Sequence, residues 1–386
     1  MQLIKYAVCG ELTLNNKKTK TIAFYIGSLA KGGAERVMVN LAEYFYNQGY
    51  RVFLVTKLKE QDEYPCTEGI TRIIADLTKQ EERGRIRNFY NRISKLKKVW
   101  KEIKPDLIVS FIRKNNLMAL ASAHSLKIPV YVSVRSDPAR ELKGKLMKYL
   151  SFFMFHGAAG IILQTTQAKD FFPKALQKKA VILPNSLNPM FISAILQEEQ
   201  NIEMSRRIKE IVQVGRIDSN KNQRMLITVF DKIAEAYPDW KVRLYGDGED
   251  RQKLEEYADT LSCRKQIFFM GQQTDIQEKI KNASVFVLTS RAEGMPNALM
   301  EAMTLGLAVI ATDCPCGGPR DLIHDHENGI LIPVDDEGAL KKALTDLMND
   351  EEYRIKLGKE AKKIVTVLHP NLVNRKWEEY LMPEVR

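Results

Sequence analysis

The feature that most constrains the fold is an alternation of short apolar segments with amphipathic segments, which runs through the chain twice. In the first half, β-prone stretches occupy residues 21–29, 51–57, 106–111, 129–135, 160–165 and 180–185, with mainly helical patterns between them. Strands that alternate with helices predict a parallel sheet with helices on both faces. We therefore expect a doubly wound α/β domain in the first half of the chain.

The alternation lapses at residues 187–205 and then restarts. Later β-prone stretches occupy residues 211–216, 240–248, 266–271, 284–290, 307–313 and 328–333. The 386 residues also exceed the roughly 250 to 300 at which a single core stops growing. We predict a Rossmann-like domain at residues 1–190, a second at 206–368, and a last helix at 369–386 that returns toward the first domain.

Two such domains leave a cleft between the carboxyl ends of their strands, where open α/β sheets bind ligands. The stretch RAEGMPNALMEAM, residues 291–303, follows a predicted strand at this edge. Pro296 near the first turn and Gly306 near the end delimit a helix. The free N–H groups at its start favour an anion such as a diphosphate.

Charged residues surround this predicted helix start. Glu293 precedes the helix and Glu301 lies inside it, so the two carboxylates could bind hydroxyls on different parts of one extended ligand. Spacing alone leaves ordinary surface roles open for both. Arg216 and Lys221 follow the first strand of the second domain, where cations suit a diphosphate leaving group.

Five motifs together carry a family resemblance: KGGAER (31–36), VGRIDSNKNQ (214–223), LYGDGED (244–250), EGMPNALMEAM (293–303) and DCPCGGPRDLI (313–323). The chain resembles the retaining, nucleotide-sugar-dependent glycosyltransferases of family 4, of the type that builds bacterial polysaccharides and lipid-linked glycans. The resemblance implies the GT-B fold, in which two Rossmann-like domains face each other across a cleft.

The resemblance also implies roles for single residues. It assigns Glu301 to the ribose hydroxyls, Glu293 to the donor sugar, and Arg216 and Lys221 to the diphosphate. Arg216, Lys221 and Glu293 are the predicted catalytic residues. The complete predicted donor site comprises Gly32, Gly33, Gly215, Arg216, Lys221, Gly246, Glu293, Gly294, Met295, Pro296, Asn297 and Glu301. For Gly32 and Gly33, a tight strand-to-helix turn explains the glycines equally well.

One position departs from the family pattern. Many members have a histidine after a strand of the first domain, close to the reacting sugar, whereas this chain has Arg135 there. Arg135 either marks a subgroup or binds a phosphate of the acceptor. We place it with Arg113 on the acceptor side of the predicted site.

No metal or cofactor is expected. Cys314 and Cys316, followed by His324 and His326, have spacing that a zinc site could use, but they fall inside a family-like loop. No Asp-x-Asp triplet occurs in the sequence, in keeping with a transferase that stabilises the leaving phosphate with arginine and lysine. The odd number of scattered cysteines and the lack of a signal-peptide pattern predict a cytoplasmic protein.

The positive charge is concentrated in the first half. Residues 1–200 contain 32 basic and 17 acidic residues, a balance of +15, whereas the remainder contains 27 and 31, a balance of −4. Residues 84–104 form a basic amphipathic pattern, and residues 149–155 are apolar. These segments predict either a solvated surface or contact with the inner face of an anionic membrane, and residues 84–104 could instead meet a phosphorylated acceptor. No DNA or RNA module accompanies the charge, so nucleic acid is not an expected partner.

We therefore expect a glycosyltransferase that moves a sugar from a nucleotide diphosphate, UDP being the expected nucleotide, to a hydroxyl of a glycan acceptor. The expected acceptor is a sugar on a polyprenyl diphosphate, and the expected transfer retains the anomeric configuration without a metal. Two other readings stay open. One is another GT-B enzyme, such as a nucleotide-sugar epimerase or a phosphorylase. The other is a non-catalytic basic protein that binds membranes or RNA.

Overall fold

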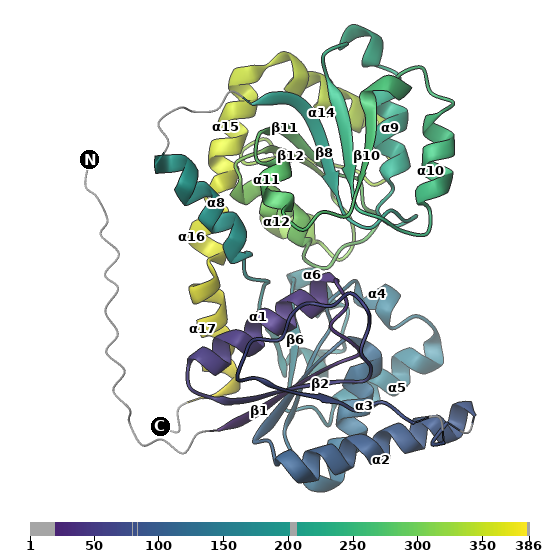
Figure 1. Ribbon diagram of the computed structural model, residues 1–386, viewed down its shortest axis with the longest axis vertical. Coiled ribbons are helices and arrows are strands. Elements are labelled where there is room, and N and C mark those ends of the chain that lie inside the picture. The colour runs from purple at the N-terminus through teal and green to yellow at the C-terminus, as the bar shows by residue number, and fades with distance from the viewer. Residues whose placement is uncertain (1–19, 79, 83, 201–206, 384–386) are drawn as a thin grey trace.

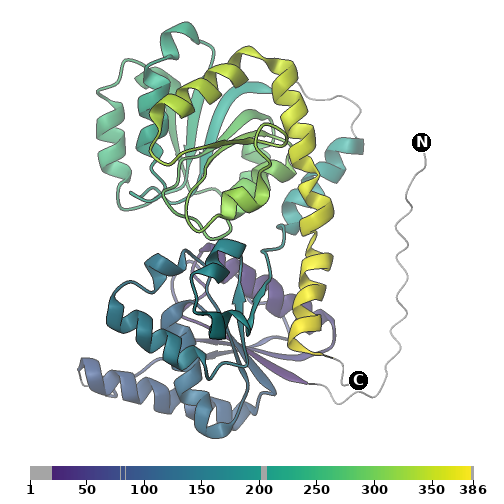
Figure 2. The same ribbon diagram turned by 180° about the vertical axis from the view of Figure 1, so that it is seen from behind.

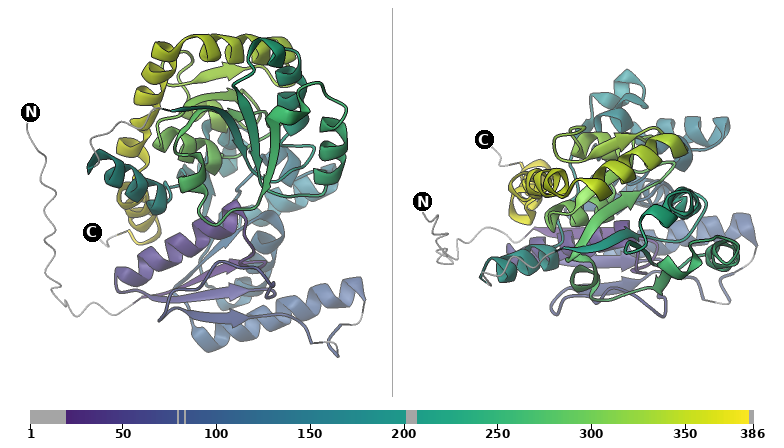
Figure 3. Two further views of the ribbon diagram at one scale, coloured as in Figure 1. Left: turned by 45° about the horizontal axis from the view of Figure 1, so that its top comes forward. Right: turned by 90° about the horizontal axis from the view of Figure 1, so that it is seen from above.

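The computed structural model describes residues 20–78, 80–82, 84–200 and 207–383. These residues form two α/β domains, with the first domain at the bottom of Figure 1 and the second at the top. Each domain contains a parallel sheet with helices on both faces, which further views show for the second domain (Figure 3). The prediction of two doubly wound domains is confirmed.

The first domain has a parallel sheet in the order β3-β2-β1-β4-β5-β6-β7. Its elements are β1 (Thr21–Ile26), α1 (Gly33–Asn47), β2 (Arg51–Thr56), β3 (Thr71–Ile74), α2 (Arg85–Ile103), β4 (Leu107–Phe111), α3 (Arg113–Ala123), η1 (His124–Leu126), β5 (Val130–Ser133), α4 (Pro138–Glu141), α5 (Lys145–Phe155), β6 (Gly160–Leu163), α6 (Thr166–Asp170), α7 (Lys174–Gln177) and β7 (Ala180–Ile182).

The second domain has a parallel sheet in the order β10-β9-β8-β11-β12-β13. Its elements are β8 (Ile208–Val214), α9 (Gln223–Asp231), η2 (Ala234–Ala236), β9 (Lys241–Tyr245), α10 (Arg251–Ala258), η3 (Arg264–Gln266), β10 (Ile267–Gly271), α11 (Ile276–Ile280), β11 (Ala283–Leu288), α12 (Asn297–Thr304), β12 (Ala308–Thr312), α13 (Gly318–Leu322), β13 (Ile330–Ile332), α14 (Glu337–Asn349) and α15 (Glu351–Lys362).

Both sheets reverse their strand order at the centre, between β1 and β4 and between β8 and β11. Doubly wound sheets bind ligands in the crevice outside the carboxyl ends of the strands at such a point. The loops after β1 and β4 and those after β8 and β11 are therefore the places where site residues are expected. α1 lies along the side of the first domain that faces the second (Figures 1 and 3).

Three apolar clusters hold the chain together. One lies between the first sheet and α2, α3 and α5, and another between the second sheet and α9 and α14. The third runs through both domains and includes residues of α1, α8 (Pro189–Gln200), α12, α16 (Ile364–Leu368) and α17 (Pro370–Leu381). The contact between the domains thus contains apolar core as well as polar groups.

The chain crosses between the domains twice. The stretch expected as a linker contains α8, which packs against α11 and α12. Later, α16 and α17 run from the second domain down onto the first (Figure 2). On α17, the Trp377 ring lies 6.0 Å from the Phe111 ring, and the Glu378 carboxylate accepts hydrogen bonds from Tyr44 and Tyr50 at 2.8 and 3.0 Å.

The basic amphipathic pattern at residues 84–104 forms α2, but only part of its apolar face is buried. Leu96, Val99, Trp100 and Ile103 in the second half are buried. In the first half, Phe89 and Tyr90 are 48% and 66% exposed. Among the described residues, no helix is both long enough and apolar enough to cross a membrane.

Candidate active site

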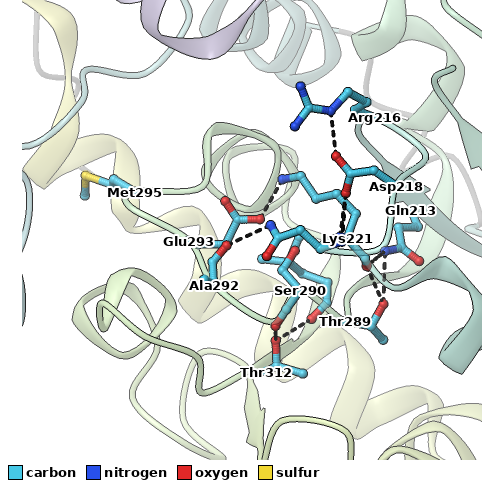
Figure 4. Close-up of polar contacts among 12 residues, drawn as sticks. Gln213, Arg216, Asp218, Lys221, Thr289, Ser290, Ala292, Glu293, Met295 and Thr312 are labelled. Carbon is cyan, nitrogen blue, oxygen red and sulfur yellow. Dashed lines mark hydrogen bonds and ion pairs between the residues drawn. The ribbon is translucent and has the colours of Figure 1, made fainter. Parts of the chain in front are cut away.

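The loops after β8 and β11 are fixed against each other at the switch point of the second sheet (Figure 4). The Thr289 hydroxyl lies 3.0 Å from the carbonyl oxygen of Lys221. The buried Gln213 amide donates to the same carbonyl and to Thr289, both at 3.1 Å. Farther along, the Arg291 N–H donates to the Asn220 carbonyl at 2.8 Å. The two predicted site segments are therefore held by main-chain and buried side-chain contacts.

Asp218 shapes the first of these loops. One of its carboxylate oxygens accepts the N–H groups of Asn220 and Lys221 at 3.0 and 2.9 Å, and the other accepts from Arg216 Nε at 2.6 Å. Burial opposes ionisation of Asp218, but these hydrogen bonds outweigh it and lower the pKa of the carboxyl group. The Arg216 side chain remains 74% exposed, so Asp218 fixes its Nε while the rest of the guanidinium can still bind a ligand.

Lys221 and Glu293, which were assigned to neighbouring parts of the donor, contact each other. Lys221 Nζ lies 2.6 Å from Glu293 Oε1, and the two side chains are 21% and 12% exposed. Each group thus neutralises the other in the ligand-free protein. A ligand that brings phosphate oxygens to Lys221 and hydroxyls to Glu293 can satisfy both groups separately.

The helix predicted after Pro296 is α12, which begins at Asn297. Glu301 lies on its buried side and forms an ion pair with Arg36 of α1, in the other domain. Burial raises the pKa of Glu301, and the positive charge of Arg36 opposes that shift. Arg36 was not among the predicted site residues, although it ends the motif KGGAER. The sequence could not show that this arginine faces a glutamate in the second domain.

Some glycines of the predicted site lie where two segments of the chain approach each other closely. A Cβ atom at Gly246 would lie 2.0 Å from the Gly215 carbonyl oxygen, so the turns after β8 and β9 pack directly on each other. A Cβ at Gly33 would lie 3.1 Å from the Asn297 side-chain nitrogen. Gly33 of the first domain therefore lies against the first residue of α12.

The two arginines predicted on the acceptor side lie in different surroundings. Arg135 is only 9% exposed, and its guanidinium stacks 4.6 Å from the centre of the Phe111 ring and bonds to Asn185. Its guanidinium is thus enclosed by protein groups in this structure. Arg113 begins α3, where its backbone N–H donates to the Glu141 carboxylate.

In the Cys–His segment, the two cysteines are buried and the two histidines are exposed. Burial raises the pKa of the Cys314 thiol to about 12 and that of Cys316 to about 11. His324 is exposed, and His326 hydrogen-bonds to the Tyr353 hydroxyl at 2.8 Å. Within the described ranges, no three His, Cys, Asp or Glu side chains gather closely enough to hold a metal ion.

Comparison with known proteins identifies the family of both domains. Residues 31–190 match the family model described as glycosyltransferase family 4, and residues 197–364 match the one described as glycosyl transferases group 1. The chain is 26% identical over 373 residues to an N-acetylgalactosaminyltransferase of Campylobacter jejuni whose name specifies an undecaprenol diphosphate-linked acceptor. That alignment covers 95% of this chain and 99% of the relative.

Two further similarities agree with this one. The amylovoran biosynthesis glycosyltransferase AmsD of Erwinia amylovora is 22% identical over 94% of this chain and 99% of its own length. The crystal structure of Anabaena HepE in complex with UDP superposes with a TM-score of 0.77, at 17% identity, over 94% of this chain and 99% of HepE. At that identity, the likeness to HepE shows the shared fold.

The two family models follow one another along the chain and together take in both domains, and the structural neighbours share the same two-domain fold. The chain therefore belongs to the glycosyltransferases of family 4 and has the GT-B fold.

Proposed function

We propose that this glycosyltransferase transfers a sugar from a UDP-sugar to a hydroxyl of a polyprenyl diphosphate-linked glycan, with retention of configuration and without a metal ion. The observation that carries the proposal is the grouping of Arg216, Lys221 and Glu293 beside the start of α12. A helix start and two cations suit a diphosphate, and a carboxylate suits sugar hydroxyls. HepE crystallises with UDP and with UDP-glucose, and the Campylobacter relative is named for a lipid-linked acceptor.

In the proposed reaction, the acceptor hydroxyl oxygen forms a bond to the anomeric carbon while the bond from that carbon to the β-phosphate oxygen breaks. The acceptor proton passes to the departing phosphate, so no protein base is required. Attack and departure occur on the same face of the sugar, which retains its configuration. Arg216 and Lys221 stabilise the negative charge that grows on the phosphate, a preorganised electrostatic contribution.

The first experiment identifies the donor and the stereochemistry. A panel of UDP- and GDP-sugars is incubated with lipid-linked acceptors, and nucleotide release and product are measured, the anomeric configuration by NMR. We expect UDP release that depends on the acceptor and a product with the configuration of the donor. An inverted product, or an epimerised sugar nucleotide without transfer, would refute the proposal.

The same assay tests metal independence. Because two protein cations flank the proposed phosphate site, we expect full transfer in the presence of EDTA. Loss of transfer in EDTA, restored by Mg²⁺ or Mn²⁺, would show that a divalent ion is required.

The proposed acceptor implies contact with a membrane, and α5 offers a suitable surface. Leu146, Tyr149, Leu150 and Phe153 follow helical spacing and are 80%, 68%, 42% and 77% exposed. Exposed lysines at positions 143 and 145 flank them. An apolar helix face beside basic residues is typical of helices that lie in the interface of an anionic bilayer. We call these four residues the α5 face.

Vesicle flotation tests this part of the proposal. The α5 variant carries Leu146→Ser, Tyr149→Ser and Phe153→Ser, and the control carries Val367→Ser and Leu372→Ser, which are also exposed apolar positions. A third variant changes Lys97, Lys98 and Lys101 of α2 to Glu and leaves Lys95, which pairs with Glu81. We expect the wild type and the control to float with anionic vesicles, and the α5 variant to stay behind. Equal flotation of the α5 variant would refute a role for this face.

A further inference from the structure

One buried asparagine joins the two domains at the proposed donor site. Asn185 follows β7 at the end of the first sheet and is 3% exposed. Its side-chain nitrogen donates to the Met295 carbonyl at 3.2 Å and to Asn297 Oδ1 at 2.7 Å. Its backbone N–H points at the Met295 sulfur at 3.1 Å. Asn185 therefore binds the main chain just before α12 and the first residue of that helix.

The side-chain oxygen of Asn185 is held from the other side. It accepts from Gln164 Nε2 at 2.8 Å and from Arg135 Nη2. Gln164 follows β6 and Arg135 follows β5, so neighbouring strands of the first sheet converge on one oxygen atom. With both amide atoms engaged, the orientation of the Asn185 side chain is fixed, because turning the amide over would place donors against donors and acceptors against acceptors.

The Arg135 guanidinium is buried and has few polar partners besides Asn185. Its buried Nε has no hydrogen-bond partner among the described residues, and burial lowers the pKa of the guanidinium to about 9. A buried charge costs stability, and Asn185, Ser133, the Phe111 ring and the charge of the Glu141 carboxylate offset that cost here. The buried guanidinium of Arg135 is therefore in a position to hold the side chain of Asn185 in one orientation.

The loop at residues 294–297, here called the donor loop, also packs tightly against the first domain. A Cβ at Gly294 would lie 2.6 Å from Gln164 Oε1 and 2.7 Å from the Arg135 carbonyl oxygen. On the far side of the Asn185 contact, the Asn297 side chain lies against Gly33. The loop from Gly294 to Asn297 is thus placed by the first domain and not only by its own.

We propose that Asn185 is a positioning residue for sugar transfer, which fixes the Met295 main chain and the Asn297 side chain, and that Arg135 orients Asn185 for this task. The inference rests on the proposed function, in which this loop lines the donor sugar and phosphate. Nucleotide affinity is assigned to Glu301, Arg216 and Lys221, none of which contacts Asn185. We therefore expect a loss in turnover that exceeds the loss in UDP binding.

The test uses Asn185→Asp, which keeps the oxygen that Arg135 and Gln164 bind but places an acceptor against the Met295 carbonyl. Displacement of a reacting group by about 1 Å can cost about a hundredfold in rate. We expect kcat for transfer to fall at least about tenfold, with the UDP dissociation constant changed less than about threefold.

The control is Asn374→Ala, which removes another buried asparagine, on α17, away from the donor loop. If Asn185→Asp folds as stably as this control yet retains wild-type kcat, the inference is wrong. It is equally wrong if both variants lose activity only in proportion to lost stability. If the wild type itself does not bind UDP, the proposed function fails instead, so the two failures are distinguishable.

Arg135 is tested through Asn185. Arg135→Met should lower kcat, and Arg135→Lys, which keeps a charged donor, should retain more of it. Because Arg135 acts by way of Asn185, adding Arg135→Met to Asn185→Asp should lower kcat by less than the product of the two single effects. Fully multiplicative losses would overturn the proposed link between the two residues.

Discussion

Substitution of Glu301 by alanine should weaken UDP binding, and the structure sets the scale of the effect. Glu301 is 6% exposed and forms its ion pair with Arg36 across the domain boundary. A ribose bound at this carboxylate must take over from Arg36. The Arg36 side chain is 21% exposed, so water can solvate it after it is released or after Glu301 is removed. We therefore expect the variant to fold.

The magnitude follows from the hydrogen bonds exchanged. A hydrogen bond to a charged group contributes about 1.5–3 kcal/mol. The ribose diol can donate two such bonds to Glu301, and binding costs the one from Arg36, which leaves a net gain of about one bond. Since 1.4 kcal/mol corresponds to a factor of ten, Glu301→Ala should raise the UDP dissociation constant by roughly 10- to 150-fold.

Titration calorimetry with UDP measures this, and Arg36 provides the internal check. In the wild type Arg36 competes with the ribose, so Arg36→Ala should tighten UDP binding. In the Glu301→Ala background, Arg36→Ala should change nothing, because the competition is gone. A folded Glu301→Ala protein that binds UDP within about twofold of the wild type would refute the assignment. An Arg36→Ala variant that weakens UDP binding would refute the competition.

Three further predictions concern the same site. Arg216→Ala and Lys221→Ala should each lower kcat by about two orders of magnitude in the transfer assay, the scale for loss of one preorganised donor to a developing anion; losses below about threefold would exclude a role at the leaving phosphate. Glu293→Ala should reduce kcat more than UDP affinity, since UDP lacks the sugar to which Glu293 is assigned; calorimetry and steady-state kinetics on the same preparation separate the two effects. Burial raises the pKa of Glu301, so on acidification its carboxylate takes up a proton at a pH above the ordinary value of 4.5, and UDP binding should weaken in that window; Glu301→Gln shares the titration of the nucleotide but should lack this additional pH dependence.

The elements around the donor site could be predicted because their signals are local. An apolar run, then Pro296 and then Gly306 define β11, the loop and α12 within about two dozen residues. The position of Glu293 before the helix and of Glu301 inside it follows directly from those boundaries. Family motifs then supply roles that spacing alone does not.

The contacts between domains could not be predicted, because their partners are far apart in the chain. Arg36 and Glu301 are separated by 265 positions, and Asn185 and Met295 by 110. No periodicity links such pairs, and the orientation of the two domains decides whether they meet. For the same reason, the contact of Arg135 with Asn185 could not be predicted, and its place on the acceptor side stays a prediction.

Periodicity also failed to predict how far each helix face is covered. The apolar positions of α2 continue along the whole helix, yet Phe89 and Tyr90 are exposed while Trp100 is fully buried. The spacing of apolar residues shows which face of a helix is apolar, but not what lies against it. The same holds for α5, where Phe155 is in the core and Phe153, two positions earlier, faces outward.

The distribution of contacts between the domains bears on how a donor could enter. Apolar contacts gather where α8, α16 and α17 cross, and the Leu187 N–H bonds to the Leu368 carbonyl there at 3.0 Å. Across the cleft, the contacts named above are polar: Arg36 with Glu301, and Asn185 with the donor loop. Polar contacts can be exchanged for those of a ligand at small net cost, whereas separating packed apolar surface exposes it to water. Donor binding would therefore change polar contacts between the domains first. The apolar contacts of α8, α16 and α17 would be kept. Burial separates the two polar contacts. The Arg36 side chain is 21% exposed, so Glu301 can change partner during binding. Asn185 is 3% exposed and both of its amide atoms are engaged, so we expect its contacts with residues 294–297 to persist.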